Sequence, residues 1–120
     1  MRFEVGVDIV ENSRFTPDVL EDKSFMEKYF TENERGYCFS QANPAQHFAA
    51  RFAGKEAVVK ALYGFGIKCR IENIEIVLDE LNVPRVITHN IMTNHGEMVI
   101  KISLSHSDSI SIAYSTIYSK

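Results

Sequence analysis

The stretch Arg51-Phe52-Ala53-Gly54-Lys55-Glu56-Ala57-Val58-Val59-Lys60-Ala61-Leu62 decides the fold of this chain. It combines apolar bulk with alanines that let neighbouring elements come close. A helix this apolar should be largely buried, and the charged side chains within it are therefore costly. These charges are the first candidates for a functional site.

The helix that contains this stretch is predicted to cover about residues 44–63. Asn43 offers an N-cap oxygen, Pro44 fits the first helical position, and Gln46 stands where a capping box requires it. At the other end, Gly64-Phe65-Gly66 supplies a residue that can adopt a left-handed conformation and end the helix.

Glu56 and Lys60 stand four residues apart and therefore share one face of the helix. One interpretation is a weak ion pair on a solvated surface, which is common in helices. The other is a site in which a carboxylate holds a metal and an ammonium one turn away faces phosphate oxygens. The helix alone leaves both open, and the rest of the chain has to decide between them.

Composition limits the classes of function. The chain has 120 residues, 45% of them hydrophobic, which suits a single domain over residues 1–120 with a real core. A net charge of −3 does not favour nucleic acid as a partner. Cys38 and Cys69 form no metal or disulfide motif. No apolar run reaches the ~18 residues of a membrane span and no signal peptide is evident, so we expect a cytoplasmic protein without membrane contact.

The first strand is predicted by an alternation of aliphatic residues over residues 3–10. Asp8 falls on the face opposite the aliphatic one. A carboxylate is unfavourable there unless it is hydrogen-bonded or meets a cation. It could also end the strand by accepting bonds from nearby backbone N–H groups.

The remaining pattern predicts a helical segment over residues 16–30 and a helix over 31–40 that starts with a capping box at Thr31. Strands are predicted over residues 71–78, 84–88 and 98–105 and again from 110, with turns at 79–82, 94–96 and 106–109. A strand, then helices, then a run of antiparallel strands indicates an α+β fold, with helices packed on one face of a mainly antiparallel sheet.

Three separated motifs together resemble one family. They are VGVDIV at residues 5–10 with Arg14-Phe15, FAARFAGKEAVVKAL at 48–62, and ISLSHS at 102–107. The chain resembles the holo-acyl-carrier-protein synthases, the small 4′-phosphopantetheinyl transferases, over nearly its whole length. The resemblance implies the 4′-phosphopantetheinyl transferase fold and transfer of 4′-phosphopantetheine from coenzyme A to a serine of acyl carrier protein. The second product would be adenosine 3′,5′-bisphosphate.

The resemblance also implies residue roles. Asp8 and Glu56 match the family's carboxylates for a divalent cation, usually Mg²⁺, and Lys60 and His106 match its helix lysine and its histidine. Magnesium prefers oxygen ligands and commonly uses one or two carboxylates with substrate phosphates and water. Lys60 could reach the same phosphates. Glu56 is the first candidate for the general base, and Lys60 could serve if its pKa were lowered.

Coenzyme A is expected to meet further residues outside the metal site. Arg51, Lys55 and His106 are candidates for its 3′-phosphate and adenine, and the backbone at Gly64 for the nucleotide. For each there is a structural alternative: a solvated helix edge for Arg51 and Lys55, a backbone-bonded turn for His106, and a simple helix cap for Gly64.

Two departures from the family pattern concern the partners. Asn82-Val83-Pro84 replaces the family's usual glycine, basic residue and proline. Acidic residues such as Glu21 weaken the basic helix that docks the acidic carrier, so Arg14 and apolar contacts from residues 25–30 are expected to dock it. The family assembles as homotrimers with sites between subunits, which the resemblance implies here. The alternatives are a coenzyme A-binding module without transferase activity and a structural domain without a ligand.

Overall fold

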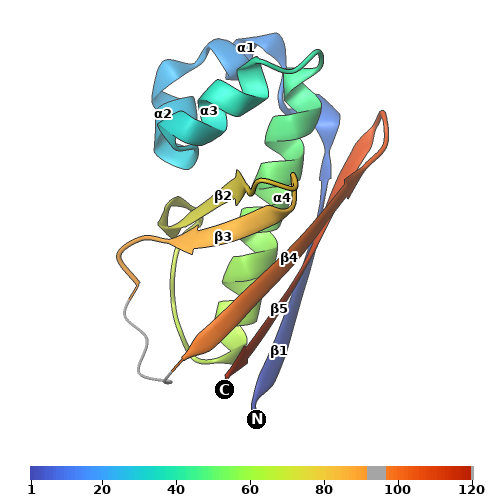
Figure 1. The fold of residues 1–120 in the computed structure, drawn as a ribbon. Helices are drawn as coiled ribbons and strands as arrows, with labels where there is room; N and C mark the ends of the chain where they lie inside the picture. Colours follow the sequence, from blue (N-terminus) through green and yellow to red (C-terminus); the bar gives the residue numbers. More distant parts are fainter. Residues whose placement is uncertain (92–96, 120) are drawn as a thin grey trace.

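The computed structural model describes residues 1–91 and 97–119. In chain order, the elements are β1 (Phe3–Glu11), the 3₁₀ turn η1 (Asn12–Arg14), α1 (Pro17–Glu21), α2 (Lys23–Tyr29), α3 (Glu32–Phe39), α4 (Pro44–Gly64), the 3₁₀ turn η2 (Ile71–Asn73), β2 (Ile74–Leu78), β3 (Pro84–Thr88), β4 (Met98–His106) and β5 (Ile110–Ser119) (Figure 1). The turn predicted at 94–96 lies outside the described residues.

The long helix α4 packs across a three-stranded antiparallel sheet with the order β1-β5-β4 (Figure 1). The hairpin β2–β3 forms a second antiparallel sheet, and α1, α2 and α3 gather near the N-terminal end of α4. This arrangement confirms the predicted α+β class. Among the described residues, no helix is both long and apolar enough to cross a bilayer.

Gly6 allows β1 to lie directly against α4. A Cβ atom at this position would overlap the backbone carbonyl of Ala57 and crowd the backbone N–H of Ala61. Ala57 and Ala61 of α4 provide the matching flat surface and are fully buried. As a result, the face of β1 that carries Gly6, Asp8 and Val10 turns toward the helix, and Asp8 is brought close to α4.

The ends of α4 agree only partly with the sequence analysis. Gly66 adopts φ +79° just after the helix, as the predicted left-handed stop requires. Pro44 occupies the first turn, but Asn43 makes no side-chain cap, so the predicted capping box is wrong. Its other member, Gln46, donates instead to the carbonyl oxygen of Ser107 at 2.8 Å, in the loop between β4 and β5.

Two other element boundaries also differ from prediction. The segment over residues 16–30 breaks into α1 and α2 because Asp22 caps the second helix, its Oδ1 accepting from Phe25 N at 3.1 Å. The strand predicted from residue 71 begins at Ile74, because η2 precedes it. The capping box at Thr31 is confirmed, with Glu34 as its other member.

The apolar side chains of the 25–30 segment are only partly available at the surface. Met26 and Phe30 are each 2% exposed and belong to an aromatic core with Phe15 and Phe48. These two side chains are not available to a carrier, but Phe25 and Tyr29 are only half-buried, so docking through this segment and Arg14 stays a prediction.

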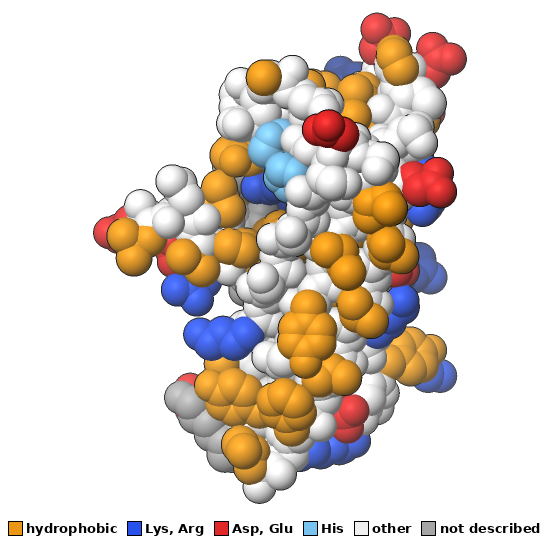
Figure 2. Space-filling view, turned by 90° about the vertical axis from the view of Figure 1, so that its right-hand side faces the viewer, with side chains coloured by type: hydrophobic (Ala, Val, Ile, Leu, Met, Phe, Trp, Pro, Cys, Tyr) orange, Lys and Arg blue, Asp and Glu red, His pale blue; other side chains and the backbone are white. Residues whose placement is uncertain are grey.

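A large apolar face of the sheet is instead left open on the side away from α4. Seven side chains of β1 and β5 on this face are 39–61% exposed: Phe3, Val5, Val7, Ile9, Ile110, Ile112 and Tyr114. The register pairs Ile9 with Ile112 and Val7 with Tyr114, so these residues form one continuous surface. Figure 2 shows hydrophobic side chains gathered along this side of the molecule. We call these seven residues the open sheet face.

Candidate active site

Asp8 and Lys60 meet between β1 and α4. Lys60 Nζ lies 3.1 Å from Asp8 Oδ1 and also donates to the carbonyl oxygen of Val7 at 3.0 Å. The Asp8 side chain is 18% exposed and that of Lys60 is 53% exposed. Of the two possibilities for the carboxylate on the strand, the structure shows the one in which it meets a cation, and both groups remain accessible to a ligand.

Glu56 completes this group of charges. Partial burial raises the pKa of the Glu56 carboxyl, the nearby Asp8 carboxylate raises that pKa further, and the cations Lys60 and Arg14 oppose the rise. In the described part of the chain, Lys60 forms its ion pair with Asp8 rather than with Glu56. The simple surface pair between Glu56 and Lys60 is therefore not what the structure contains. We call Asp8, Glu56 and Lys60 the carboxylate site.

A separate cleft of about 500 Å³ holds Arg51 and His106. Arg51 is 4% exposed, and its guanidinium lies over the ring of Tyr37, with Cζ 4.4 Å from the ring centroid. The rings of His47 and His106 are 5.8 Å apart between centroids. Burial lowers the pKa of His47, and the charges of Arg51 and His106 lower it further. We call this the basic cleft.

Asn82 contributes to the basic cleft from the turn between β2 and β3. Its φ of +60° places it in the left-handed region, which asparagine tolerates better than most residues. Asp79 holds the turn, because its Oδ1 accepts from the N–H groups of Leu81 and Val83 and its Oδ2 accepts from Arg85 Nε at 2.9 Å. Asparagine therefore provides the backbone geometry that glycine would supply in the family pattern.

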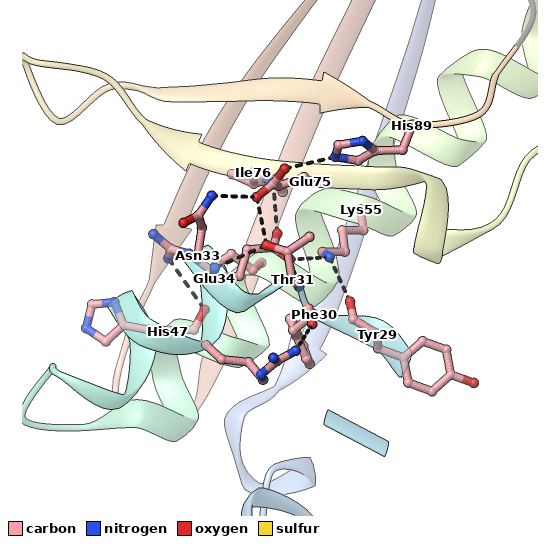
Figure 3. Close-up of polar contacts among 12 residues, drawn as sticks. Tyr29, Phe30, Thr31, Asn33, Glu34, His47, Lys55, Glu75, Ile76 and His89 are labelled. Carbon is pink, nitrogen blue, oxygen red and sulfur yellow. Dashed lines mark hydrogen bonds and ion pairs between the residues drawn. The ribbon is translucent and has the colours of Figure 1, made fainter. Parts of the chain in front are cut away.

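Lys55 faces neither group of site residues. Its side chain is 1% exposed, with Nζ 2.6 Å from Glu34 Oε1 and 2.7 Å from the carbonyl oxygen of Tyr29 (Figure 3). Burial lowers the pKa of Lys55, and the Glu34 carboxylate opposes that shift. The structure gives Lys55 a buried partner, so we exclude it from the proposed coenzyme A contacts.

Glu34 joins three elements around this lysine. Its Oε1 accepts from Lys55 on α4, its Oε2 accepts from the N–H of Ile76 on β2 at 2.8 Å, and it stands on α3. Beside it, Glu75 accepts from Thr31 Oγ1 at 2.7 Å and pairs with His89 Nε2 at 2.9 Å (Figure 3). This network fixes α3, α4 and the β2–β3 hairpin, which together form much of the basic cleft.

Gly64 lies at the other end of α4, against the N-terminal residues. Its carbonyl oxygen accepts from Arg2 Nη2 at 2.5 Å, and a Cβ there would collide with the side chain of Glu4. Because the Glu4 side chain is flexible and partly exposed, this overlap alone does not explain the glycine. Its predicted contact with the nucleotide stays untested.

Comparison with known proteins identifies the family of this chain. The sequence profile of the 4′-phosphopantetheinyl transferase superfamily matches residues 4–114. The chain belongs to this superfamily. It is 38% identical to the holo-[acyl-carrier-protein] synthase of Clostridium perfringens over 94% of this chain and 91% of that one. It is 40% identical to the holo-[acyl-carrier-protein] synthase of Chlamydia trachomatis serovar D, over 88% and 90% of the two chains.

Solved structures of such synthases share the fold. A holo-(acyl-carrier-protein) synthase from Bacillus anthracis in complex with CoA (3′,5′-ADP) is 30% identical and superposes with a TM-score of 0.77, covering 98% of this chain and 96% of that one. An ACPS-CoA complex from Chronobacterium ammoniagenes is 20% identical, with a TM-score of 0.80, and supports the fold alone.

In this transferase, the carboxylate site and the basic cleft lie on opposite sides of α4. A helix turns about 100° per residue, so Arg51 and Lys60 are about 180° apart around its axis. Asp8 is on β1 and His106 is on β4, and these are the two outer strands of the three-stranded sheet. The structure therefore brings together Asp8, Glu56 and Lys60, and separately Arg51 and His106.

Sequence reasoning did not assign Tyr37 and His47 to the site, and it named Asn82 only as part of a departure from the family pattern. His47 precedes Arg51 by four residues, so helical spacing alone places both on one face of α4. The left-handed tolerance of asparagine after a turn was a usable signal for Asn82. Tyr37 had no comparable signal, because an aromatic residue at helical spacing is normally a core residue.

Proposed function

We propose that this chain transfers the 4′-phosphopantetheine group of coenzyme A to a serine hydroxyl of an apo-acyl carrier protein. The products are the holo-carrier and adenosine 3′,5′-bisphosphate. The observation that carries the proposal is the carboxylate site, in which two carboxylates and an ammonium meet on a superfamily member. The whole chain, residues 1–120, acts as one transferase domain.

Asp8 and Glu56 are the residues that would hold Mg²⁺. They fit, because the charge of Asp8 raises the pKa of Glu56, and a divalent cation would relieve that repulsion. Within the described residues, no cluster of three or more side chains of the types that bind metals is found, and the remaining ligands of such a cation would be oxygens of coenzyme A and water. The bound cation supplies charge neutralisation at the phosphate oxygens.

The reaction also needs a base for the serine proton. Glu56 is our first candidate, directly or through a water molecule, because it lies beside Lys60 and Asp8 at the carboxylate site, whereas Lys60 would need a lowered pKa to serve. The serine oxygen attacks the phosphorus that carries the phosphopantetheine arm, its proton passes to Glu56, and the bond to the adenosine bisphosphate oxygen breaks. The ammonium of Lys60 stabilises the charge that develops on the phosphate oxygens.

The basic cleft receives the nucleotide end of coenzyme A. Arg51 and His106 would contact the 3′-phosphate and adenine there, and Asn82 also lines this cleft. Because the carboxylate site lies on the other side of α4, the two ends of one coenzyme A molecule would meet different subunits. Each active site is accordingly completed by a neighbouring copy of the chain.

The open sheet face is the surface that we assign to the contact between copies in a homotrimer. A continuous apolar surface of this kind is typical of an interface. Replacing Val7 or Ile112 with glutamate should release monomers, measured by light scattering. The monomers should also lose transferase activity at low protein concentration. A parent chain that is monomeric at micromolar concentration and fully active would contradict this assembly.

We place the enzyme in the cytoplasm, where coenzyme A and the carrier meet.

Mass spectrometry of an apo-acyl carrier protein tests the function directly. Incubation with this chain, coenzyme A and Mg²⁺ should add one phosphopantetheine group to the carrier serine. Asp8→Asn and Glu56→Gln should each reduce the rate by at least about 100-fold while leaving the circular dichroism spectrum unchanged. Tight binding of coenzyme A without any transfer would instead make this chain a coenzyme A-binding module.

A further inference from the structure

Asn12 is a buried asparagine whose polar atoms are all directed at one loop. It is 5% exposed, and its Nδ2 donates to the carbonyl oxygens of Ser107 at 2.9 Å and Asp108 at 3.2 Å. Its Oδ1 accepts from Ser111 Oγ at 2.7 Å, and its backbone N–H donates to the carbonyl oxygen of Ser109 at 2.9 Å. A buried amide is unfavourable unless it is hydrogen-bonded, and here each group is satisfied by the same loop.

The loop that Asn12 holds begins directly after His106. The carbonyl oxygen of Ser107 accepts a second hydrogen bond, from Gln46 Nε2 at 2.8 Å, and the N–H of Ser107 donates to the carbonyl oxygen of Ile110 at 2.8 Å. The residue that follows His106 is thus fixed from η1, from α4 and from within the hairpin. His106 itself is exposed at the rim of the basic cleft.

The backbone of η1 does not require this side chain. The backbone N–H of Asn12 already joins η1 to Ser109. The N–H of Phe15 donates to the carbonyl oxygen of Asn12 at 3.1 Å and closes the turn. The amide of Asn12 therefore adds contacts whose direct effect is on the conformation of residues 107–111.

We propose that Asn12 is a positioning residue for coenzyme A, acting through His106. By fixing the loop after β4, it holds His106 at the basic cleft before the ligand arrives, so binding does not have to order that segment. This inference rests on the proposed function, since it assigns the nucleotide end of coenzyme A to the basic cleft. It also places Asp8 of the carboxylate site and the residue that positions His106 on one continuous segment of the chain.

A double-mutant cycle tests the proposal, with the dissociation constant of coenzyme A measured by calorimetry. Asn12→Leu should raise that constant about threefold to tenfold, the worth of one or two hydrogen bonds. The turnover number at saturating coenzyme A should change by less than about twofold. In a His106→Ala background, Asn12→Leu should change the constant by less than about twofold, because the residue through which it acts is gone.

Two further variants separate positioning from stability. Ser111→Ala removes the hydroxyl that orients Asn12 and should raise the dissociation constant about twofold in a chain that folds normally. Asn73→Leu is the matched control. Asn73 Nδ2 donates to the carbonyl oxygen of His89 at 3.0 Å and its Oδ1 accepts from the N–H of Arg70, away from the basic cleft. It should lower the unfolding temperature and leave the dissociation constant unchanged.

Equal effects of Asn12→Leu in the parent and the His106→Ala background would overturn the proposal, and so would a fall in turnover with unchanged affinity. Because affinity is measured without the carrier, the two proposals fail differently. Absence of transfer in a chain that binds coenzyme A overturns the proposed function. Additive effects in a chain that transfers normally overturn only the role of Asn12.

Discussion

Lys55→Met removes the cation of a fully buried ion pair. In the parent, Nζ lies 2.6 Å from Glu34 Oε1 and 2.7 Å from the carbonyl oxygen of Tyr29, and the two side chains are 1% and 0% exposed. Removing one partner of such a pair typically costs about 3–5 kcal/mol, because the other charge stays buried. Glu34 keeps the N–H groups of Thr31 and Ile76 as donors, so we expect the lower end, about 3 kcal/mol.

Urea unfolding followed by circular dichroism measures this loss. The double variant Lys55→Met with Glu34→Gln should recover at least about 1 kcal/mol, because a neutral side chain needs no counter-ion. Lys60→Met is the control for an exposed pair and should cost less than about 1 kcal/mol. If Lys55→Met cost as little as the control while the KM for coenzyme A rose tenfold or more, Lys55 would be the phosphate ligand that its place in the sequence suggested.

Three further predictions test other parts of the molecule. Lys60→Ala should lower the turnover number about 10-fold or more and the affinity for coenzyme A much less, because the charge of Lys60 acts on the transition state. A rise in the KM for coenzyme A alone would make Lys60 a binding residue. At Asn82, alanine should cost about 1 kcal/mol in urea unfolding and glycine almost nothing, because φ is positive there; equal losses would contradict the turn assignment. Burial alone raises the pKa of Glu75, but hydrogen bonds from Thr31 and His89 lower it below the ordinary 4.5 of a glutamate. The Glu75 carboxylate therefore stabilises the fold above pH 4.5, and this stabilisation is lost as the pH falls through the lowered pKa of the folded state. Glu75→Gln should lose less stability than the parent below pH 4.5, and a parallel loss in both chains would refute this.

The fold class was predictable from local patterns, whereas the grouping of Asp8, Glu56 and Lys60 was expected mainly from the family resemblance. The alternation over β1 located Asp8 on the face opposite the aliphatic residues, where a carboxylate needs hydrogen bonds or a cation, and the structure provides the cation Lys60. The left-handed glycine after α4 followed from the same kind of rule, because few other residues adopt positive φ.

The errors arose where a side chain had two possible partners. Gln46 stands at the capping-box position, yet it donates to Ser107, which is 61 residues away in sequence. Asp22 looked like one more polar residue of a continuous helix, but its carboxylate caps α2 and divides the segment. In both cases a local pattern was correct as a propensity, and a tertiary contact or a competing cap decided the outcome.

The open sheet face shows something that sequence alternation cannot predict, namely which layer covers a given face of a strand. Alternation predicted an aliphatic face for β1, and the usual expectation is that such a face packs against the helices of its own domain. In this chain, the other face packs against α4, because glycine at position 6 permits an approach that a side chain would block. The pattern indicates which residues share a face, and it does not say whether the covering layer comes from the same chain or from another copy.

The four charged residues between positions 51 and 62 lie on two different faces of α4, although they belong to one sequence motif. Arg51 and Lys55 are about 40° apart around the axis of α4, and so are Glu56 and Lys60, while the two pairs are about 140° apart. One subunit therefore cannot direct all four at one bound ligand. The first pair faces α3 and the β2–β3 hairpin, where Lys55 is neutralised by Glu34 and Arg51 borders the basic cleft. The second pair faces β1 and Asp8. A motif that looks like one site in sequence is thus divided between two faces of α4, and this division is our reason for proposing that two copies of the chain share one coenzyme A molecule.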